Sequence, residues 1–101
     1  MMKVTAIFGH PTRAEEFEKY SKDTHLPLAA QMRGIARIEF TKFVAGPDGG
    51  KAASHRMAEL YFTSPAQLEQ TLGSPEEKAT VADLPKFATG GVTVVIGSVE
   101  G

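Results

Sequence analysis

The sequence predicts an α+β fold made of one antiparallel sheet and two helical stretches, and three observations lead to it. Four segments alternate apolar and polar side chains in the manner of half-buried strands. Three other segments begin with a Ser or Thr that is followed three residues later by Glu or Gln, the signature of a helix start. Together these segments follow the order β-α-β-β-α-β along the chain.

The expected strands are Lys3 to Phe8, Ile35 to Phe43, His55 to Phe62 and Val92 to Val99. The segment AGPDGGKAAS separates the middle two strands, and its Gly, Pro and Asp residues suit a long exposed hairpin loop. Such an order is that of a ferredoxin-like domain, a four-stranded antiparallel sheet with helices on one face. A length of 101 residues favours a single domain over residues 1–101.

The expected helix starts are Thr12, Ser64 and Ser74. A hydroxyl at each position can accept a hydrogen bond from a backbone N–H group that the first helical turn leaves free. Pro65 and Pro75 follow two of these residues directly, at the first helical position, where the missing N–H of proline removes no helical hydrogen bond. Two helical stretches therefore flank the middle strands.

The first helix should run from about Arg13 to near Thr24, because Pro27 interrupts the helical hydrogen bonds and disfavours the α conformation at Leu26. His25 then falls in or just past the last turn. A histidine there can bond the free carbonyl groups of a helix end. It can equally serve as a general acid or base in a site, and the pattern leaves both interpretations open.

Composition and charge exclude several classes of function. The formal net charge is -1 and the basic residues form no stripe, so neither nucleic acid nor a membrane surface is an expected partner. The chain has no cysteine, which removes disulfides, thiolate metal sites and cysteine nucleophiles and fits a reducing cytoplasm. The first residues also lack a signal peptide, so we expect a cytoplasmic protein. The three histidines lack metal-ligand spacing, so no metal site is expected.

Strand parity sorts the strand residues onto two faces of the sheet. One set is almost wholly apolar, which assigns it to the helices: Val4, Ala6, Phe8, Ala36, Ile38, Phe40, Ala58, Leu60, Phe62, Val92, Val94 and Ile96. The other set, called the mixed face below, combines polar and apolar side chains: Thr5, Ile7, Arg37, Glu39, Thr41, Met57, Glu59, Tyr61, Thr93 and Val95.

The mixed face has two interpretations. An antiparallel sheet can show one face to water, with its charges solvated or paired across strands. Alternatively, a second copy of the chain covers this face and encloses a cavity with polar groups inside, because exposed apolar patches usually mark an interface or a ligand groove. We favour the dimer, and we expect an enclosed pocket beside the mixed face.

Three stretches, in order, resemble the EthD family: FEKYSKDTHLPLAAQMRGI, MAELYFTSPAQLEQTLGSPE and ADLPKFATGGVTVVIGSVE. The resemblance covers nearly the whole chain. It implies that two ferredoxin-like sheets face one another as a dimeric α+β barrel, in which each half encloses a pocket. It also implies association with a monooxygenase system, since the family takes its name from an operon that degrades ethyl tert-butyl ether. Members are often labelled reductases, but this chain has no Gly-rich dinucleotide loop after a strand, so no bound cofactor is expected.

His25 and Asp83 match the family's histidine and its late acidic residue, and they are the expected catalytic residues. Asp83 can alternatively cap a short helical turn that carries Pro85. Two carboxylates on the mixed face can supply a proton acceptor or can be paired with a neighbouring arginine. The expected substrate-binding residues are Glu39, Glu59, Tyr61, Arg37, Met57 and Ile7.

These features predict an EthD-like homodimer that acts on a small apolar metabolite in a degradation or oxidation pathway. The expected chemistry is proton transfer or cofactor-independent oxidation, which would make the protein an oxidoreductase or an isomerase. Two alternatives from other classes are a non-catalytic carrier that serves a monooxygenase system and a purely structural dimer. An enzyme needs a proton-transfer group in an enclosed space, whereas a carrier needs only an apolar lining.

Overall fold

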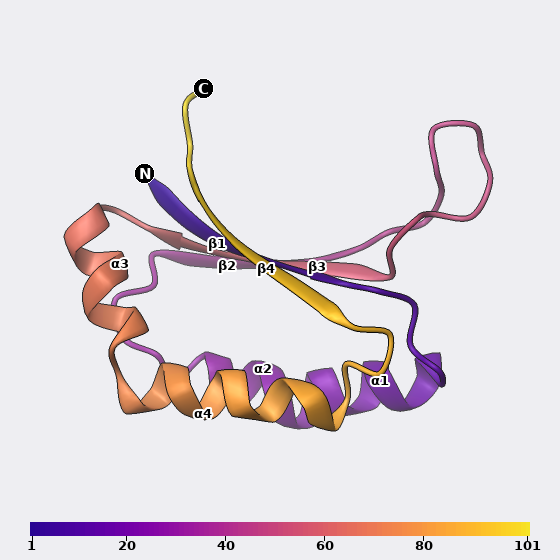
Figure 1. Ribbon diagram of the computed structural model, residues 1–101, viewed down its shortest axis with the longest axis horizontal. Helices are drawn as coiled ribbons and strands as arrows, with labels where there is room; N and C mark the ends of the chain where they lie inside the picture. The colour runs from indigo at the N-terminus through magenta and orange to yellow at the C-terminus, as the bar shows by residue number, and fades with distance from the viewer.

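The computed structural model describes all 101 residues and contains one antiparallel sheet of four strands. The strands are β1 (Met2–Phe8), β2 (Arg37–Lys42), β3 (Arg56–Phe62) and β4 (Val92–Ser98), and they lie in the order β2-β3-β1-β4. All neighbouring pairs are antiparallel. The fold predicted from the sequence is therefore confirmed, and a long loop joins β2 to β3 (Figure 1).

The helices lie on one side of the sheet (Figure 1). They are α1 (Ala14–Tyr20), α2 (Leu26–Ala29), α3 (Pro65–Leu72) and α4 (Pro75–Asp83). Helix α2 packs against α4, and α3 stands at one end of the sheet before the chain turns into α4 (Figure 1). The opposite face of the sheet carries no helix (Figure 1).

The first helical stretch does not end near Thr24, and that prediction is wrong. A π-helical turn, Ser21–His25, continues α1 directly into α2, with the Leu26 N–H donating to the carbonyl of Ser21 five residues earlier. Proline has no N–H, and its ring would press on the carbonyl four residues before it in a regular α-helix. The π-turn adds one residue to the helical turn immediately before Pro27, where a regular α-helix would bring the proline ring against that carbonyl. His25 consequently lies inside a continuous helical run and caps no helix end.

Two of the three predicted helix caps are confirmed. The hydroxyls of Ser64 and Ser74 accept hydrogen bonds of 3.1 and 3.2 Å from the backbone N–H three residues later. Thr12 caps nothing, because α1 begins only at Ala14. Its backbone N–H instead donates to the side chain of Thr89 at 2.9 Å, which ties the start of the first helix to the segment before β4.

The apolar core lies between the sheet and the helices. Phe8, Phe17 and Phe87 are each at most 5% exposed, and the rings of Phe8 and Phe17 meet edge-to-face at 5.3 Å. The strand register places the predicted apolar set on this side. The helices do not cover β4 completely, however, and Val94 and Ile96 stay about half exposed, at 50% and 55%.

Candidate functional site

An apolar pocket of about 310 Å³ lies between the sheet and the helices. Of the 22 residues in its wall, 17 are hydrophobic. The wall as a whole is formed by all four strands, the π-turn, α2, α3, α4 and the segment after α4. Small side chains leave this space open: Ala6 faces Ala58 directly in the register of β1 and β3, and Ala29 lies in the opposite wall on α2. The pocket is on the apolar face, whereas we expected it beside the mixed face.

His25 lies in the wall of this pocket, with only 7% of its surface exposed. Its ring packs against Phe87 with 4.5 Å between centroids. Nδ1 lies 3.0 Å from Oδ2 of Asp83. Nε2 makes no hydrogen bond within the chain. Ser21 Oγ is the single side-chain polar atom that is both buried and without a hydrogen-bond partner, so Nε2, which also has no partner, must be accessible. We infer that Nε2 faces the pocket.

Asp83, at the end of α4, is 5% exposed and collects three contacts. Oδ1 accepts a hydrogen bond from the hydroxyl of Tyr20 at 2.7 Å and lies 3.6 Å from Nζ of Lys86, while Oδ2 meets His25. Its side chain therefore caps no turn. Burial acts to raise the pKa of Asp83, but the hydrogen bonds from His25 and Tyr20 and the charge of Lys86 hold it below its ordinary value.

The ionised carboxylate of Asp83 fixes the tautomer of His25. A carboxylate only accepts hydrogen bonds, so Nδ1 carries a proton and donates it to Oδ2. The free electron pair is then on Nε2, at the pocket wall. Tyr20 holds the other carboxylate oxygen, and its own pKa is raised chiefly by this hydrogen bond to Asp83. The structure thus joins both residues that the sequence selected as catalytic, although they are 58 positions apart.

The six expected substrate-binding residues lie on the sheet face opposite this pocket, so the structure does not bring them together with His25. Tyr61 donates to Oε1 of Glu39 at 3.0 Å, and the guanidinium of Arg37 lies 4.2 Å from the centre of the Tyr61 ring. Glu59 forms an ion pair of 2.6 Å with Lys3, whose pKa is raised mainly by this hydrogen bond. Lys3 was missed in the sequence, although its odd position in the first strand places it on the mixed face.

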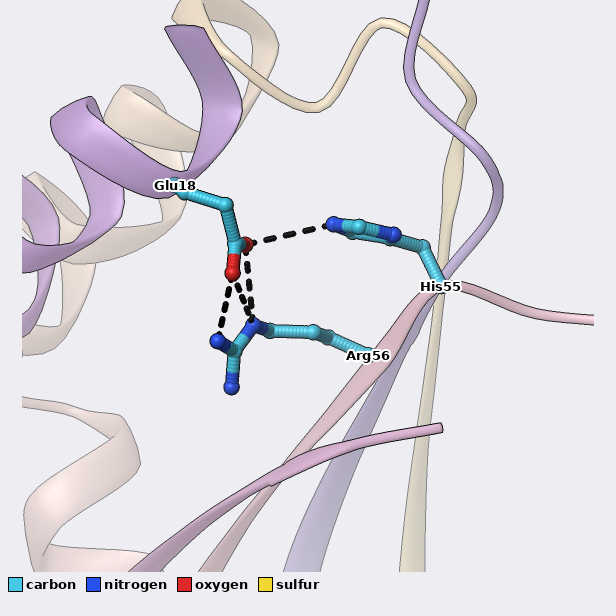
Figure 2. A network of polar contacts seen from close by, with 3 residues as sticks. All are labelled: Glu18, His55 and Arg56. Atoms are coloured by element: carbon cyan, nitrogen blue, oxygen red, sulfur yellow. Dashed lines mark hydrogen bonds and ion pairs between the residues drawn. The ribbon is translucent and has the colours of Figure 1, made fainter. Parts of the chain in front are cut away.

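A second polar cluster joins α1 to the start of β3 (Figure 2). Arg56 donates from Nε and Nη2 to the carboxylate of Glu18, and His55 Nε2 lies 3.2 Å from the same carboxylate (Figure 2). Hydrogen bonds from Arg56, outweighing burial, lower the pKa of Glu18. His55 is 8% exposed and lies edge-on to Phe17. His10, in contrast, is exposed.

Replacing Glu18 by glutamine is expected to lower the free energy of unfolding by about 1–2 kcal/mol at pH 7, because Arg56 loses its bidentate acceptor in a half-buried position. Urea denaturation followed by circular dichroism measures the change. Glu15→Gln, on the exposed side of the same helix, is the matched control and should stay within about 0.5 kcal/mol of the parent. Equal stability of both variants would show that the cluster contributes nothing.

No three His, Asp or Glu side chains come together in a way that could hold a metal ion. None of the helices is both long and apolar enough to cross a bilayer.

Comparison with known proteins identifies the family. Residues 10–91 match the model of the EthD domain. The chain belongs to the EthD family. It is 34% identical, over 99% of its length and 96% of the relative's, to the uncharacterized 11.0 kDa protein in the thcB–thcC intergenic region of Rhodococcus erythropolis.

Solved structures share the fold of this EthD-family chain. An EthD family protein from Bacillus halodurans superposes with a TM-score of 0.92 at 29% identity, over 99% of both chains. SnoaB from Streptomyces nogalater, a cofactor-independent oxygenase, has a TM-score of 0.66 at 15% identity, over 99% of this chain and 92% of its own. That second likeness is one of fold alone.

Proposed function

We propose that this EthD-family chain binds a small, largely apolar molecule between its sheet and helices and transfers a proton to or from it through His25. The observation that carries the proposal is a buried histidine in the wall of an apolar pocket, with Nδ1 held by the buried carboxylate of Asp83. This arrangement orients a general base and stabilises the imidazolium that forms when it takes a proton.

In the proposed step, an O–H bond or an activated C–H bond of the bound molecule breaks and a new N–H bond forms at Nε2 of His25. The electron pair stays on the bound molecule, and the charge that develops on the imidazole is balanced by Asp83 across the 3.0 Å contact. The apolar wall lowers the local dielectric constant, which strengthens these interactions. The step requires no bound cofactor, and this part of the proposal is supported by SnoaB, a cofactor-independent oxygenase of the same fold.

The proposal also includes a homodimer that forms through the mixed face. No helix covers this face (Figure 1). Ile7 and Met57 lie half buried and directly opposite one another on it. Next to them, Glu59 and Tyr61 are each 8% exposed within the single chain and already have partners. These paired polar groups can enter an interface without leaving charges unsatisfied. We therefore assign the mixed face to dimer contact and the pocket to the ligand.

Proton exchange on an enolisable probe tests the role of His25. With 2-tetralone in D₂O, the protein is expected to accelerate loss of the proton α to the carbonyl, measured by NMR. His25→Gln should slow the catalysed exchange by about 10²-fold or more while binding stays within about threefold. His10→Gln, at an exposed histidine, is the control. Unchanged exchange in His25→Gln, with binding intact, would leave a carrier of apolar molecules rather than a proton-transfer enzyme.

A further inference from the structure

Three residues of the pocket wall reach the surface of the molecule. Val94 and Ile96 on β4 are 50% and 55% exposed, and Val81 on α4 is 51% exposed, whereas every other residue of the wall is buried or half buried. A side chain that lines the pocket and also meets solvent marks the place where the pocket opens. Strand β4 is an edge strand that pairs only with β1, so no further strand closes this side. These three residues are called the mouth below.

The mouth is wholly apolar. Single exposed aliphatic residues are common, but a group of them at the opening of an apolar pocket is typical of a ligand groove. Val94 and Ile96 lie on the helix side of the sheet and alternate along β4 with Thr93 and Val95, which lie on the mixed face. Dimer contact through the mixed face would therefore leave the mouth uncovered.

The wall offers a ligand few polar groups. Ser21 Oγ is sealed from water, and the hydroxyls of Thr71 and Thr80 already donate to backbone carbonyls at 2.7 and 2.8 Å. His25 and the half-buried Glu77 remain. No lysine or arginine lines the pocket, so an anionic ligand would enter an apolar space without such a partner, at a large desolvation penalty.

We propose that the pocket selects a neutral carbonyl compound with an alkyl chain that runs from His25 out through the mouth. This inference rests on the proposed function and names its substrate class. A volume of about 310 Å³ is at the low end of the range of ligand pockets, and the mouth extends the apolar surface beyond it. The carbonyl group lies near Nε2 of His25, which removes the α-proton. The far end of the chain covers the exposed parts of Val81, Val94 and Ile96, and removal of this apolar surface from water favours binding.

Methyl ketones of increasing length test this selection: 2-hexanone, 2-nonanone and 2-tridecanone. Each is titrated below its solubility limit against the full chain by ligand-observed NMR, and displacement by 2-tetralone shows that it occupies the pocket. We expect the affinity to rise about twofold or more for each added CH₂ group up to 2-tridecanone, because a chain end in the mouth is partly buried. Tridecanoate, with the same number of carbons, should bind at least about tenfold more weakly than 2-tridecanone.

A charge in the mouth should affect the far end of the chain and not the reacting end. Val94→Asp is expected to weaken 2-tridecanone binding about tenfold or more and to leave 2-hexanone binding within about twofold. Val81→Gln, on the helix side of the mouth, should change the two affinities in the same direction. Val44→Asp is the matched control, because Val44 is 89% exposed in the loop between β2 and β3, and it should change neither affinity. Thermal melting followed by circular dichroism shows that each variant is folded.

The outcomes separate this inference from the proposed function. A fall in affinity from 2-nonanone to 2-tridecanone, or equal weakening of all three ketones by Val94→Asp, would overturn the inference and leave the apolar pocket of the proposed function standing. Failure of 2-tetralone and all three ketones to bind would overturn both. Tighter binding of tridecanoate than of 2-tridecanone would contradict the selection for a neutral ligand.

Discussion

Replacing Asp83 by asparagine is expected to lower the free energy of unfolding by about 2–3 kcal/mol at pH 7, because a charged acceptor of buried hydrogen bonds is lost. Asp83 is 5% exposed and accepts from Tyr20 and His25. The amide of asparagine offers one acceptor oxygen where the carboxylate offers two, and its NH₂ group would face one of the two donors. Urea denaturation followed by far-ultraviolet circular dichroism measures the loss.

The difference in the free energy of unfolding between the parent and Asp83→Asn should become smaller as the pH falls. The pKa of Asp83 is held below its ordinary value of 3.8, so the stabilisation from its charge is fully present above that value. As the pH falls below 3.8, the unfolded chain takes up this proton first, and the stabilisation is lost as the pH passes through the lower pKa of the folded state. Asparagine has no such proton. The gap between parent and Asp83→Asn should therefore narrow in acid.

Asp23→Asn is the matched control, because Asp23 lies on the exposed side of the π-turn and pairs only with Lys19. Its effect should stay within about 0.5 kcal/mol at pH 7. A gap between parent and Asp83→Asn that stays constant from pH 7 to well below 3.8 would show that the charge of Asp83 contributes nothing to stability, and that only shape or packing is involved.

Local sequence was sufficient to predict the sheet, because alternation acts on neighbouring residues and is enforced by burial of one face. Each strand was found within about two residues of its ends. The serine caps at Ser64 and Ser74 were predicted for the same reason, since each satisfies a backbone group only three residues away. The Pro27 prediction failed because a local rule treats proline as a stop, whereas packing of α2 on α4 sustains the helix through a π-turn.

The site needed information that no local pattern holds. His25 and Asp83 were both selected, but their 3.0 Å contact depends on how the π-turn between α1 and α2 meets the end of α4, which is distant in the sequence. The pocket was expected on the wrong face because parity reports polarity and not the volume left unfilled between layers. Ser21 was missed since a serine within a helical stretch carries no signal by itself. Only the tertiary structure shows that its hydroxyl has no partner.

Replacing Met57 by lysine is expected to separate the proposed dimer into folded monomers. Met57 lies half buried on the mixed face, opposite Ile7 on β1 and Thr41 on β2. The carboxylate two positions along β3, that of Glu59, is already paired with Lys3. In a monomer the new ammonium group reaches water. In the dimer each copy would bury one without a partner, at a cost of several kcal/mol, so association should weaken at least about 100-fold. Sedimentation velocity over a range of concentrations measures this change.

Ala79→Lys places the same charge on the exposed surface of α4, away from the mixed face, and should leave association unchanged. The comparison matters because the ligand pocket and the mixed face are on opposite sides of one sheet. If Met57→Lys yields monomers that still bind 2-tetralone, the pocket is complete within one chain and the dimer is needed only to cover Ile7 and its neighbours. If the parent is itself a monomer at high concentration, the mixed face is an ordinary solvated surface, and the paired charges of Lys3 and Glu59 already suffice to keep it in water.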